Sequence, residues 1–251
     1  MNMPVFTRLD ASTMGRARTL PLLVRAQSRY MSSDAPNIDN RVYWQKVVEQ
    51  FEKHRLSVND RSLDVDLHKF MDRVGSAEKS VIEFGCGIGR AVPTLHSRGF
   101  TNYLGTDICA RAVEMAQERL PGVSFMEADI LDFRSKQKFD SVIATDVLLY
   151  LSPEDQIRAL LNVRNSLAPD APLLVRWAPG NDEIDASKQI KGTDIRGWVF
   201  LASKEYVRSL LSITGFKLTD DIVQEEALID PEANRKPPYL KIFAEKAIIG
   251  F

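Results

Sequence analysis

The stretch VIEFGCGIGR at residues 81–90 decides the fold. An apolar run with one acid inside it leads directly into three alternating glycines, Gly85, Gly87 and Gly89. Glycine adopts left-handed backbone conformations without strain and lets a ligand approach the main chain closely. A helix beginning near Arg90 would point its unpaired N–H groups at the same place. The stretch therefore predicts a strand, a ligand-binding turn and a helix.

The sequence on both sides of this turn alternates between short apolar runs and helical patterns. Such alternation predicts a parallel sheet with helices on both faces, in which ligands bind at the carboxyl ends of the strands. The predicted strands are residues 80–84, 102–106, 123–127, 139–145 and 171–177, and the predicted helices between them are 90–98, 109–119 and 152–167.

The remaining segments complete the predicted fold. Apolar residues at helical spacing predict two helices before the first strand, within residues 40–51 and 61–74, and a third that starts at Ser203 after a loop at 178–202. The last two strands, 216–224 and 239–248, have no helix between them and are expected to pair antiparallel. We expect an α/β fold: a Rossmann-like, doubly wound, seven-stranded, mostly parallel sheet with an antiparallel edge strand.

Composition restricts the class of protein. The chain has 251 residues, of which 44% are hydrophobic and 27% charged, as expected for a globular domain with a sizeable core. No apolar run approaches the roughly 20 residues of a membrane helix, so we expect no membrane span. The net charge of −1 gives no indication of nucleic-acid binding. Two cysteines and three separated histidines predict neither a disulfide framework nor a metal site.

The first thirty residues differ from the rest. They contain five arginines, no lysine and a single acid, together with Ser and Thr, which is the composition of an organelle transit peptide. A disordered tail, or a true start at Met31, would also account for them. We therefore expect residues 1–35 to lie outside the fold and residues 36–251 to form one domain. Localisation would be mitochondrial with a transit peptide and cytoplasmic without one.

The spacing of the glycines indicates the type of cofactor. The dinucleotide fingerprint G-x-G-x-x-G, read from Gly87, would need a small residue where the chain has Val92. In addition, Glu83 stands two residues before the first glycine, where it would repel a pyrophosphate. The same carboxylate suits a cofactor with an ammonium group. The glycine spacing therefore disfavours a nicotinamide-dependent oxidoreductase.

Four segments in order resemble the motifs of the class I S-adenosylmethionine-dependent methyltransferases. They are VIEFGCGIGR (81–90), LGTDI (104–108), MEADILDF (126–133) and FDSVIATDVLLYL (139–151). The resemblance covers about residues 78–178 and implies S-adenosylmethionine as methyl donor and S-adenosylhomocysteine as product. It divides the domain into lid helices (36–77), a cofactor-binding core (78–178), and a substrate loop with C-terminal strands (179–251).

The resemblance also implies roles for individual residues. The glycines would pass under the methionine and ribose, and Glu83 would lie near the methionine amino group. Asp107 would accept hydrogen bonds from the ribose hydroxyls, and Asp129 would face the adenine amino group. Asp146 and Val147 would border the methyl-transfer site, with Ile108 and Ile130 packing on the adenine ring. The implied cofactor set is Glu83, Gly85, Cys86, Gly87, Gly89, Arg90, Asp107, Ile108, Asp129, Ile130, Asp146 and Val147.

The segment after the fourth strand limits the chemistry. Methyl transfer is an in-line displacement that depends on orientation, helped by a general base when the nucleophile carries a proton. Many relatives have histidine here, whereas this chain has DVLLYL, with Asp146 and Tyr150 as catalytic candidates. Three alternatives follow: an acceptor that is already nucleophilic, such as a carboxylate or thiolate; Asp146 as base; or orientation alone.

Aromatic and arginine side chains outside the motifs are candidates for acceptor binding. They would hold a planar or acidic small molecule, although each could equally belong to the core or to a solvated face. We expect methyl transfer to an O, N or S atom, or a carboxylate, of a small molecule by a monomer or homodimer. The alternatives are a protein N-terminal amine methyltransferase and a non-catalytic, methyltransferase-like assembly factor. The candidates are Tyr43, Trp44, Arg176, Trp177, Arg196 and Trp198.

Overall fold

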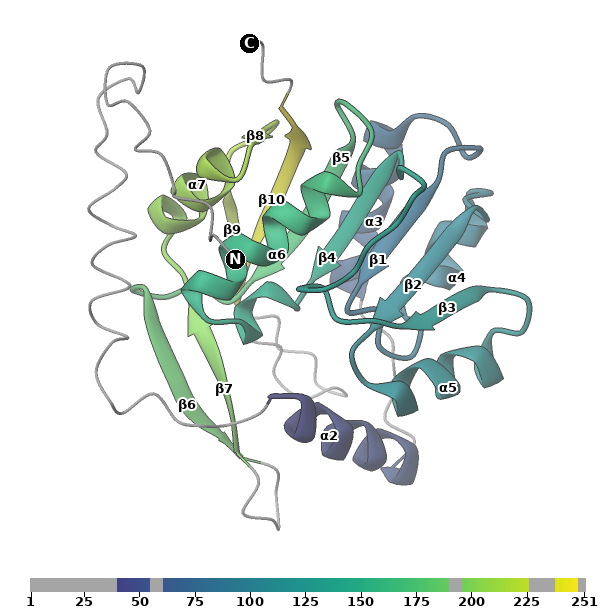
Figure 1. Ribbon diagram of the computed structural model, residues 1–251, viewed down its shortest axis with the longest axis horizontal. Coiled ribbons are helices and arrows are strands. Elements are labelled where there is room, and N and C mark those ends of the chain that lie inside the picture. Colours follow the sequence, from purple (N-terminus) through teal and green to yellow (C-terminus); the bar gives the residue numbers. More distant parts are fainter. Residues whose placement is uncertain (1–39, 55–60, 190–195, 226–237, 248–251) are drawn as a thin grey trace, which may run out of the picture.

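A central sheet lies between two layers of helices in the computed structural model, which describes residues 40–54, 61–189, 196–225 and 238–247 (Figure 1). The strand order is β3-β2-β1-β4-β5-β10-β8, and β9 also pairs with β10. The first five of these strands are parallel, and β10 is antiparallel to β5. The strands are β1 (Val81–Phe84), β2 (Tyr103–Asp107), β3 (Ser124–Glu127), β4 (Ser141–Thr145), β5 (Pro172–Trp177), β8 (Phe216–Leu218), β9 (Val223–Glu225) and β10 (Tyr239–Lys246).

The mostly parallel α/β sheet with an antiparallel partner at its edge is confirmed, with one difference in detail. The segment predicted as a single strand over residues 216–224 forms two short strands, β8 and β9. They pair with opposite ends of β10, so together they fill the outermost of the seven predicted positions. Ile222, between them, is buried, so the chain turns inward where the strand is interrupted.

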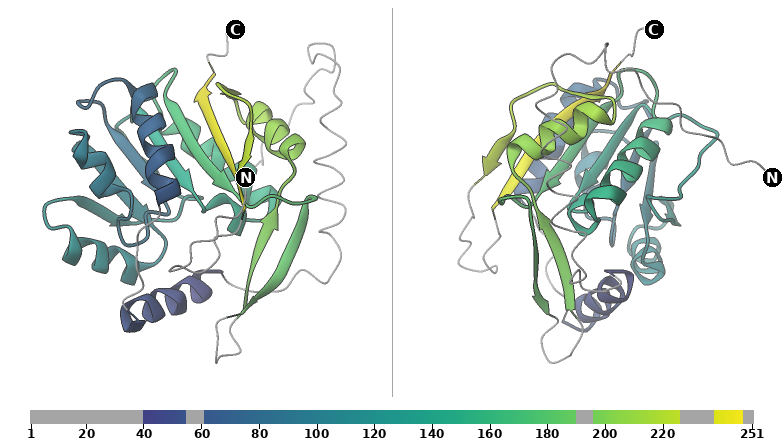
Figure 2. Two further views of the ribbon diagram at one scale, coloured as in Figure 1. Left: turned by 180° about the vertical axis from the view of Figure 1, so that it is seen from behind. Right: turned by 60° about the vertical axis from the view of Figure 1, so that its left-hand side comes forward.

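Helices cover both faces of the sheet (Figure 2). One face carries α3 (Arg61–Val74), α4 (Val92–Ser97) and α5 (Ala110–Arg119); the other carries α6 (Pro153–Asn165) and α7 (Lys204–Ile213). Serine caps set the starts of the last two, because the hydroxyls of Ser152 and Ser203 accept hydrogen bonds from the N–H groups of Asp155 and Tyr206.

The two helices expected as lids have different places. Only α2 (Asn40–His54) lies across the carboxyl ends of the parallel strands (Figure 1). Helix α3 packs flat on the sheet, so the expectation of a lid over residues 61–74 is wrong. The reason is its apolar stripe, which is wide enough to be buried completely. The buried stripe is Leu63, Leu67, Phe70, Met71 and Val74.

The predicted loop at 178–202 is also wrong, because most of it is a β-hairpin. Strands β6 (Glu183–Gln189) and β7 (Arg196–Leu201) pair antiparallel as a separate sheet, which extends beyond the carboxyl edge of the main sheet (Figure 1). Val199 and Phe200 of β7 are buried. The first arm, EIDASKQ, has weak β propensity, so its pairing depends on contacts made in the folded chain.

Two expectations concern membrane insertion and targeting. Among the described helices, each is too short or too polar to cross a bilayer. Residues 1–39 lie outside the described residues, so the transit peptide stays a prediction.

Candidate functional site

The topology puts the expected ligand site at the carboxyl ends of β1 and β4. Strand order runs outward from β1 through β2 to β3 on one side, and through β4 to β5 on the other. In open α/β sheets such a reversal of strand order leaves a gap between the two connections, where ligands bind. The glycine turn follows β1 and Asp146 follows β4, so both lie at this gap.

The glycine turn is packed on one side and open on the other. Gly85 and Gly87 have φ values of 73° and 53°, in the left-handed region. A Cβ on Gly85 would stand 2.9 Å from the Cβ of Val147, whereas a Cβ on Gly87 would meet no heavy atom within 4 Å. The turn therefore rests against the loop after β4 and leaves its main chain accessible at Gly87. Helix α4 begins at Val92, two residues later than expected.

Asp107, the last residue of β2, ties three segments together. Its Oδ2 accepts a hydrogen bond from the N–H of Gly87 at 2.8 Å, and its Oδ1 accepts one from the N–H of Cys109 at 2.9 Å. Burial raises the pKa of this carboxyl, which the hydrogen bonds from Cys109 and Gly87 partly offset. Each carboxylate oxygen has a second acceptor position, so the side chain can still accept bonds from a vicinal diol.

Glu83 is the buried acid of β1. The hydroxyl of Tyr103 donates a hydrogen bond to its Oε2 at 2.5 Å. Burial raises the pKa of Glu83 to about 7, although the Tyr103 bond and the Arg90 charge lower it. A nearby cation would favour the ionised form of this carboxyl, as expected for a ligand with an ammonium group.

Tyr103 is a site residue that the motifs do not reveal. It is diagonal to Glu83 across the β1–β2 ladder, where Glu83 pairs directly with Gly105. A Cβ on Gly105 would stand 2.8 Å from the Tyr103 hydroxyl, so only glycine leaves room for this contact. The available signal was an acid inside an apolar strand, which needs a hydrogen-bond donor from a neighbour.

Asp129 links the loop after β3 to helix α2. Its Oδ1 accepts a hydrogen bond from the N–H of Leu131 at 2.9 Å, and its Oδ2 lies 3.4 Å from Nη2 of Arg41. Arg41 was not anticipated from the sequence. Ile108 is partly exposed beside this site, whereas Ile130 is buried in the core; their packing on an adenine ring stays a prediction.

Asp146 is held in a strained conformation between two arginines. Its φ of 57° is unusual for a residue other than glycine and costs about 1–3 kcal/mol, which is typical of functional positions. Its N–H donates to the carbonyl of Arg176 at 3.3 Å. Its Oδ2 lies 3.7 Å from Nη2 of Arg90 and 4.0 Å from Nε of Arg176. The carboxylate therefore stands beside the glycine turn with its charge balanced by both guanidinium groups.

Three aromatic side chains, Tyr43, Trp44 and Tyr150, are in contact at the loop after β4. Trp44 of α2 meets Tyr150 edge to face at 4.9 Å, and Tyr43 meets Trp44 at 5.6 Å between ring centroids. A Cβ on Gly197 of β7 would stand 2.7 Å from the Tyr43 ring, so the helix and the hairpin are in contact. Burial raises the pKa of Tyr150, and the charges of Asp146 and Tyr43 raise it further. Tyr150 therefore keeps its proton near neutral pH and has a hydroxyl hydrogen that can be donated.

The residues predicted to bind the methyl acceptor do not all lie at the site, because some of them are buried in the core. Trp177 is fully buried and its Nε1 donates to the carbonyl of Phe200 at 3.0 Å, so its placement at the mouth of the site is wrong. Its neighbour Arg176 points to the opposite face of β5 because side chains alternate along a strand. Trp198 packs partly against the core, and the side chain of Arg196 lies outside the described residues.

Several other residues bear on the chemistry of the site. Cys86 is buried, and its burial, together with Glu83 and Asp107, raises the pKa of the thiol, which therefore stays neutral. Of the histidines whose side chains are described, His68 lies on α3 and His96 on α4, so neither follows β4. Within the described ranges, no three His, Cys, Asp or Glu side chains are grouped as a metal would require.

Comparisons with known proteins agree with this geometry. Residues 81–170 match a family described as a methyltransferase domain. The phosphoethanolamine N-methyltransferase of Plasmodium falciparum is 22% identical over 237 residues, which are 88% of each chain. The trans-aconitate 2-methyltransferase of Yersinia pestis is 30% identical over 41% of this chain and 40% of that protein. The fold resembles the S-adenosylmethionine-bound amino pentose methyltransferase CalS10 of Micromonospora echinaspora, with a TM-score of 0.55 and 18% identity over 80% of this chain and 97% of that one.

Proposed function

We propose that this chain, which is similar to S-adenosylmethionine-dependent methyltransferases in sequence and fold, methylates a small-molecule acceptor beside the loop after β4. The observation that carries the proposal is the position of α2 across this edge. The helix is attached to the β3 side through Arg41 and Asp129, and to the β4 side through Trp44 and Tyr150. An edge covered in this way favours a small acceptor over a polypeptide, which would need an open groove.

The residues present suit S-adenosylmethionine, which supplies a methyl group activated on a sulfonium. The open main chain at Gly87 admits a ligand, and the Asp107 carboxylate can accept hydrogen bonds from ribose hydroxyls. Glu83, whose pKa is raised to about 7 by burial, would bind the amino group in its ionised form. Asp129 would face the adenine amino group.

The chain's own groups would orient the acceptor and exclude water. The edges of Trp44 and Tyr43 cover the loop after β4, and the Tyr150 hydroxyl can donate a hydrogen bond to the acceptor. Asp146 would accept a hydrogen bond or a proton from the acceptor, and its carboxylate lies within 4.0 Å of Arg90 and Arg176. These roles suit a nucleophile that needs no histidine base, such as a neutral amine or a carboxylate.

The relatives suggest which acceptors to test first. By their names, one methylates the nitrogen of a small phosphorylated amine and another acts on a tricarboxylic acid. Small primary amines and polycarboxylic acids are therefore the first two classes of acceptor, followed by thiols.

The test follows isotope-labelled methyl groups from S-adenosylmethionine into these classes and into peptides with free N-termini. We expect label in a small molecule, and no transfer by the Asp107→Ala variant. Labelling of peptides alone would overturn the proposal in favour of the N-terminal amine methyltransferase. Binding of S-adenosylhomocysteine without transfer to any compound would favour the non-catalytic assembly factor.

We also propose that residues 1–30 direct the protein to mitochondria. The support is their arginine-rich, acid-poor composition. Fusion of these residues to a fluorescent protein should give mitochondrial import, and diffuse cytoplasmic fluorescence would contradict the proposal.

A further inference from the structure

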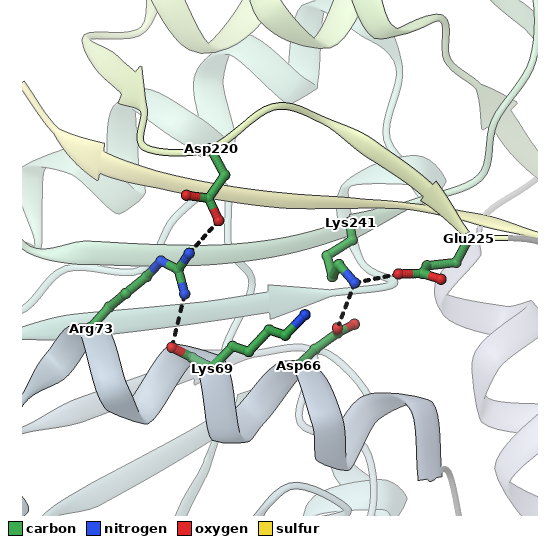
Figure 3. Close-up of polar contacts among 6 residues, drawn as sticks. All are labelled: Asp66, Lys69, Arg73, Asp220, Glu225 and Lys241. Carbon is green, nitrogen blue, oxygen red and sulfur yellow. Dashed lines mark hydrogen bonds and ion pairs between the residues drawn. The ribbon is translucent and has the colours of Figure 1, made fainter.

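Five charged side chains of alternating sign connect the loop after β4 to the C-terminal strands. We call them the charge chain: Asp146, Arg176, Asp66, Lys241 and Glu225. At one end, Arg176 Nε lies 4.0 Å from Asp146 Oδ2. At the other, Lys241 Nζ lies 3.5 Å from Asp66 Oδ1 and donates a hydrogen bond to Glu225 (Figure 3).

Strand register explains why these groups meet. Arg176 and Lys241 are direct partners across the β5–β10 ladder, so their side chains share one face of the sheet. Tyr239 lies on the same face, two residues before Lys241, and the Arg176 guanidinium stacks over its ring at 3.8 Å. Helix α3 covers this face and contributes Asp66. Burial raises the pKa of this carboxyl, and the charges of Lys241 and Arg176 offset part of that rise.

The middle of the charge chain is deeply buried. Asp66 is 0%, Arg176 5% and Lys241 7% exposed. Burial is the largest effect on the Asp66 pKa, which is raised despite the two neighbouring cations. Apolar side chains can attach a helix to a sheet at least as well as a buried ion pair, so attachment alone does not account for these charges.

A second ionic contact of α3 shows the contrast. About two turns after Asp66, Arg73 pairs with Asp220 of the segment between β8 and β9 (Figure 3). Both of these side chains are substantially exposed, at 28% and 44%. Solvent screens such a pair, whereas it screens the buried charge chain only weakly.

We propose that Asp66 and Lys241 act through Arg176 on Asp146, and thereby set the preference of the site for a sulfonium over a neutral thioether. The proposal rests on the proposed function, which places methyl transfer at the loop after β4. S-adenosylmethionine and S-adenosylhomocysteine differ there by one methyl group and one positive charge. A buried charge added to or removed from the charge chain therefore changes the affinity for the first ligand more than for the second.

The test measures the dissociation constants of S-adenosylmethionine and S-adenosylhomocysteine by calorimetry and takes their ratio. It does so in two variants, one that removes a negative charge and one that removes a positive charge. Asp66→Asn removes a negative charge, so the affinity for S-adenosylmethionine should fall about fivefold relative to S-adenosylhomocysteine. Lys241→Gln removes a positive charge, so the relative affinity should rise by about the same factor. Loosening of the α3–β10 contact would affect both variants in the same direction.

The matched control is Asp220→Asn, which removes a charge from the exposed contact of the same helix and should leave the ratio unchanged. Unchanged ratios in both charge-chain variants, or shifts of the same sign, would overturn the proposal. If Asp66→Asn does not fold, Lys241→Gln still tests the proposal, because this variant must bind S-adenosylmethionine more tightly relative to S-adenosylhomocysteine. The measurement needs no acceptor, so failure to find one would count against the proposed function alone.

Discussion

The proposed cofactor edge, at the ends of β1 and β2, and the proposed acceptor side, around the loop after β4, are held together by different kinds of contact. At the cofactor edge, Asp107 accepts hydrogen bonds from main-chain N–H groups and Glu83 accepts one from a buried tyrosine. At the acceptor side, Tyr43, Trp44 and Tyr150 meet through ring edges contributed by segments far apart in the chain. The first is fixed by the sheet itself, and the second depends on where α2 and the hairpin lie. Mutations should therefore separate the two.

The largest effect should come from Asp107→Ala. The substitution removes the acceptor for the N–H groups of Gly87 and Cys109, together with the carboxylate offered to the ribose. Charge-assisted hydrogen bonds contribute about 1.5–3 kcal/mol each, so the affinity for S-adenosylhomocysteine should fall at least about a hundredfold in calorimetry.

Asp132→Ala is the matched control, because Asp132 is exposed in the turn after β3. It should bind S-adenosylhomocysteine as the unchanged protein does. A loss of less than about threefold in Asp107→Ala would show that the cofactor edge is not organised around this carboxylate.

The second effect concerns the pH dependence of stability. The pKa of Glu83 is about 7 in the folded chain and about 4.5 in its unfolded reference, with burial as the main cause. The folded state then binds more protons between these values, so stability falls as pH rises through this window. Above it, the buried charge costs on the order of 3 kcal/mol.

Glu83→Gln removes this cost while keeping an acceptor for Tyr103. In the absence of cofactor, the variant should be more stable than the unchanged protein at pH 8 by about 2 kcal/mol and of similar stability at pH 5. Urea denaturation at the two pH values measures both differences. A stability difference that does not vary with pH would contradict the assignment of the titration to Glu83.

The same contrast explains what the sequence could predict. The glycine turn, Asp107 and Asp129 lie at the ends of consecutive strands, so local patterns and motif order place them correctly. The helix starts near Ser152 and at Ser203 were likewise predictable, because a capping residue and its partner are three residues apart. Features set by neighbours in sequence were therefore predictable.

Features set by pairing between distant segments were not. The hairpin β6–β7 was expected as a loop, and Trp177 was expected at the mouth of the site instead of in the core. Arg41 and Tyr103 reach partners 88 and 20 residues away, and no local pattern encodes those contacts. Arg176 was predicted to bind the acceptor, but its side chain is buried on the face of β5 that helix α3 covers. The sequence alone does not say which face of a strand a helix will cover.

The third effect tests the acceptor side alone. Trp44→Ala removes the edge contact with Tyr150 and opens the site to water. With the acceptor found in the labelling experiment, kcat/KM should fall about tenfold, since aromatic contacts contribute about 0.5–1.5 kcal/mol beyond their buried area. The affinity for S-adenosylhomocysteine should change little.

Val42→Ala on the same helix is the control, because Val42 is exposed and should tolerate truncation. Equal losses of cofactor affinity and of kcat/KM in Trp44→Ala would mean that α2 belongs to the cofactor edge as much as to the acceptor side.

The smallest effect comes from the contact that joins the two regions. Arg41 and Asp129 are 3.4 Å apart, with half of the arginine side chain exposed. Such pairs contribute about 0.2–1 kcal/mol and weaken with salt. Arg41→Ala should therefore weaken S-adenosylhomocysteine binding by at most about fivefold at low salt and not measurably at high salt. Lys46→Ala, whose ion pair with Glu49 stays within α2, should show neither change. A loss of tenfold or more, independent of salt, would mean that the position of α2 organises the cofactor edge, and the distinction between the two regions would fail.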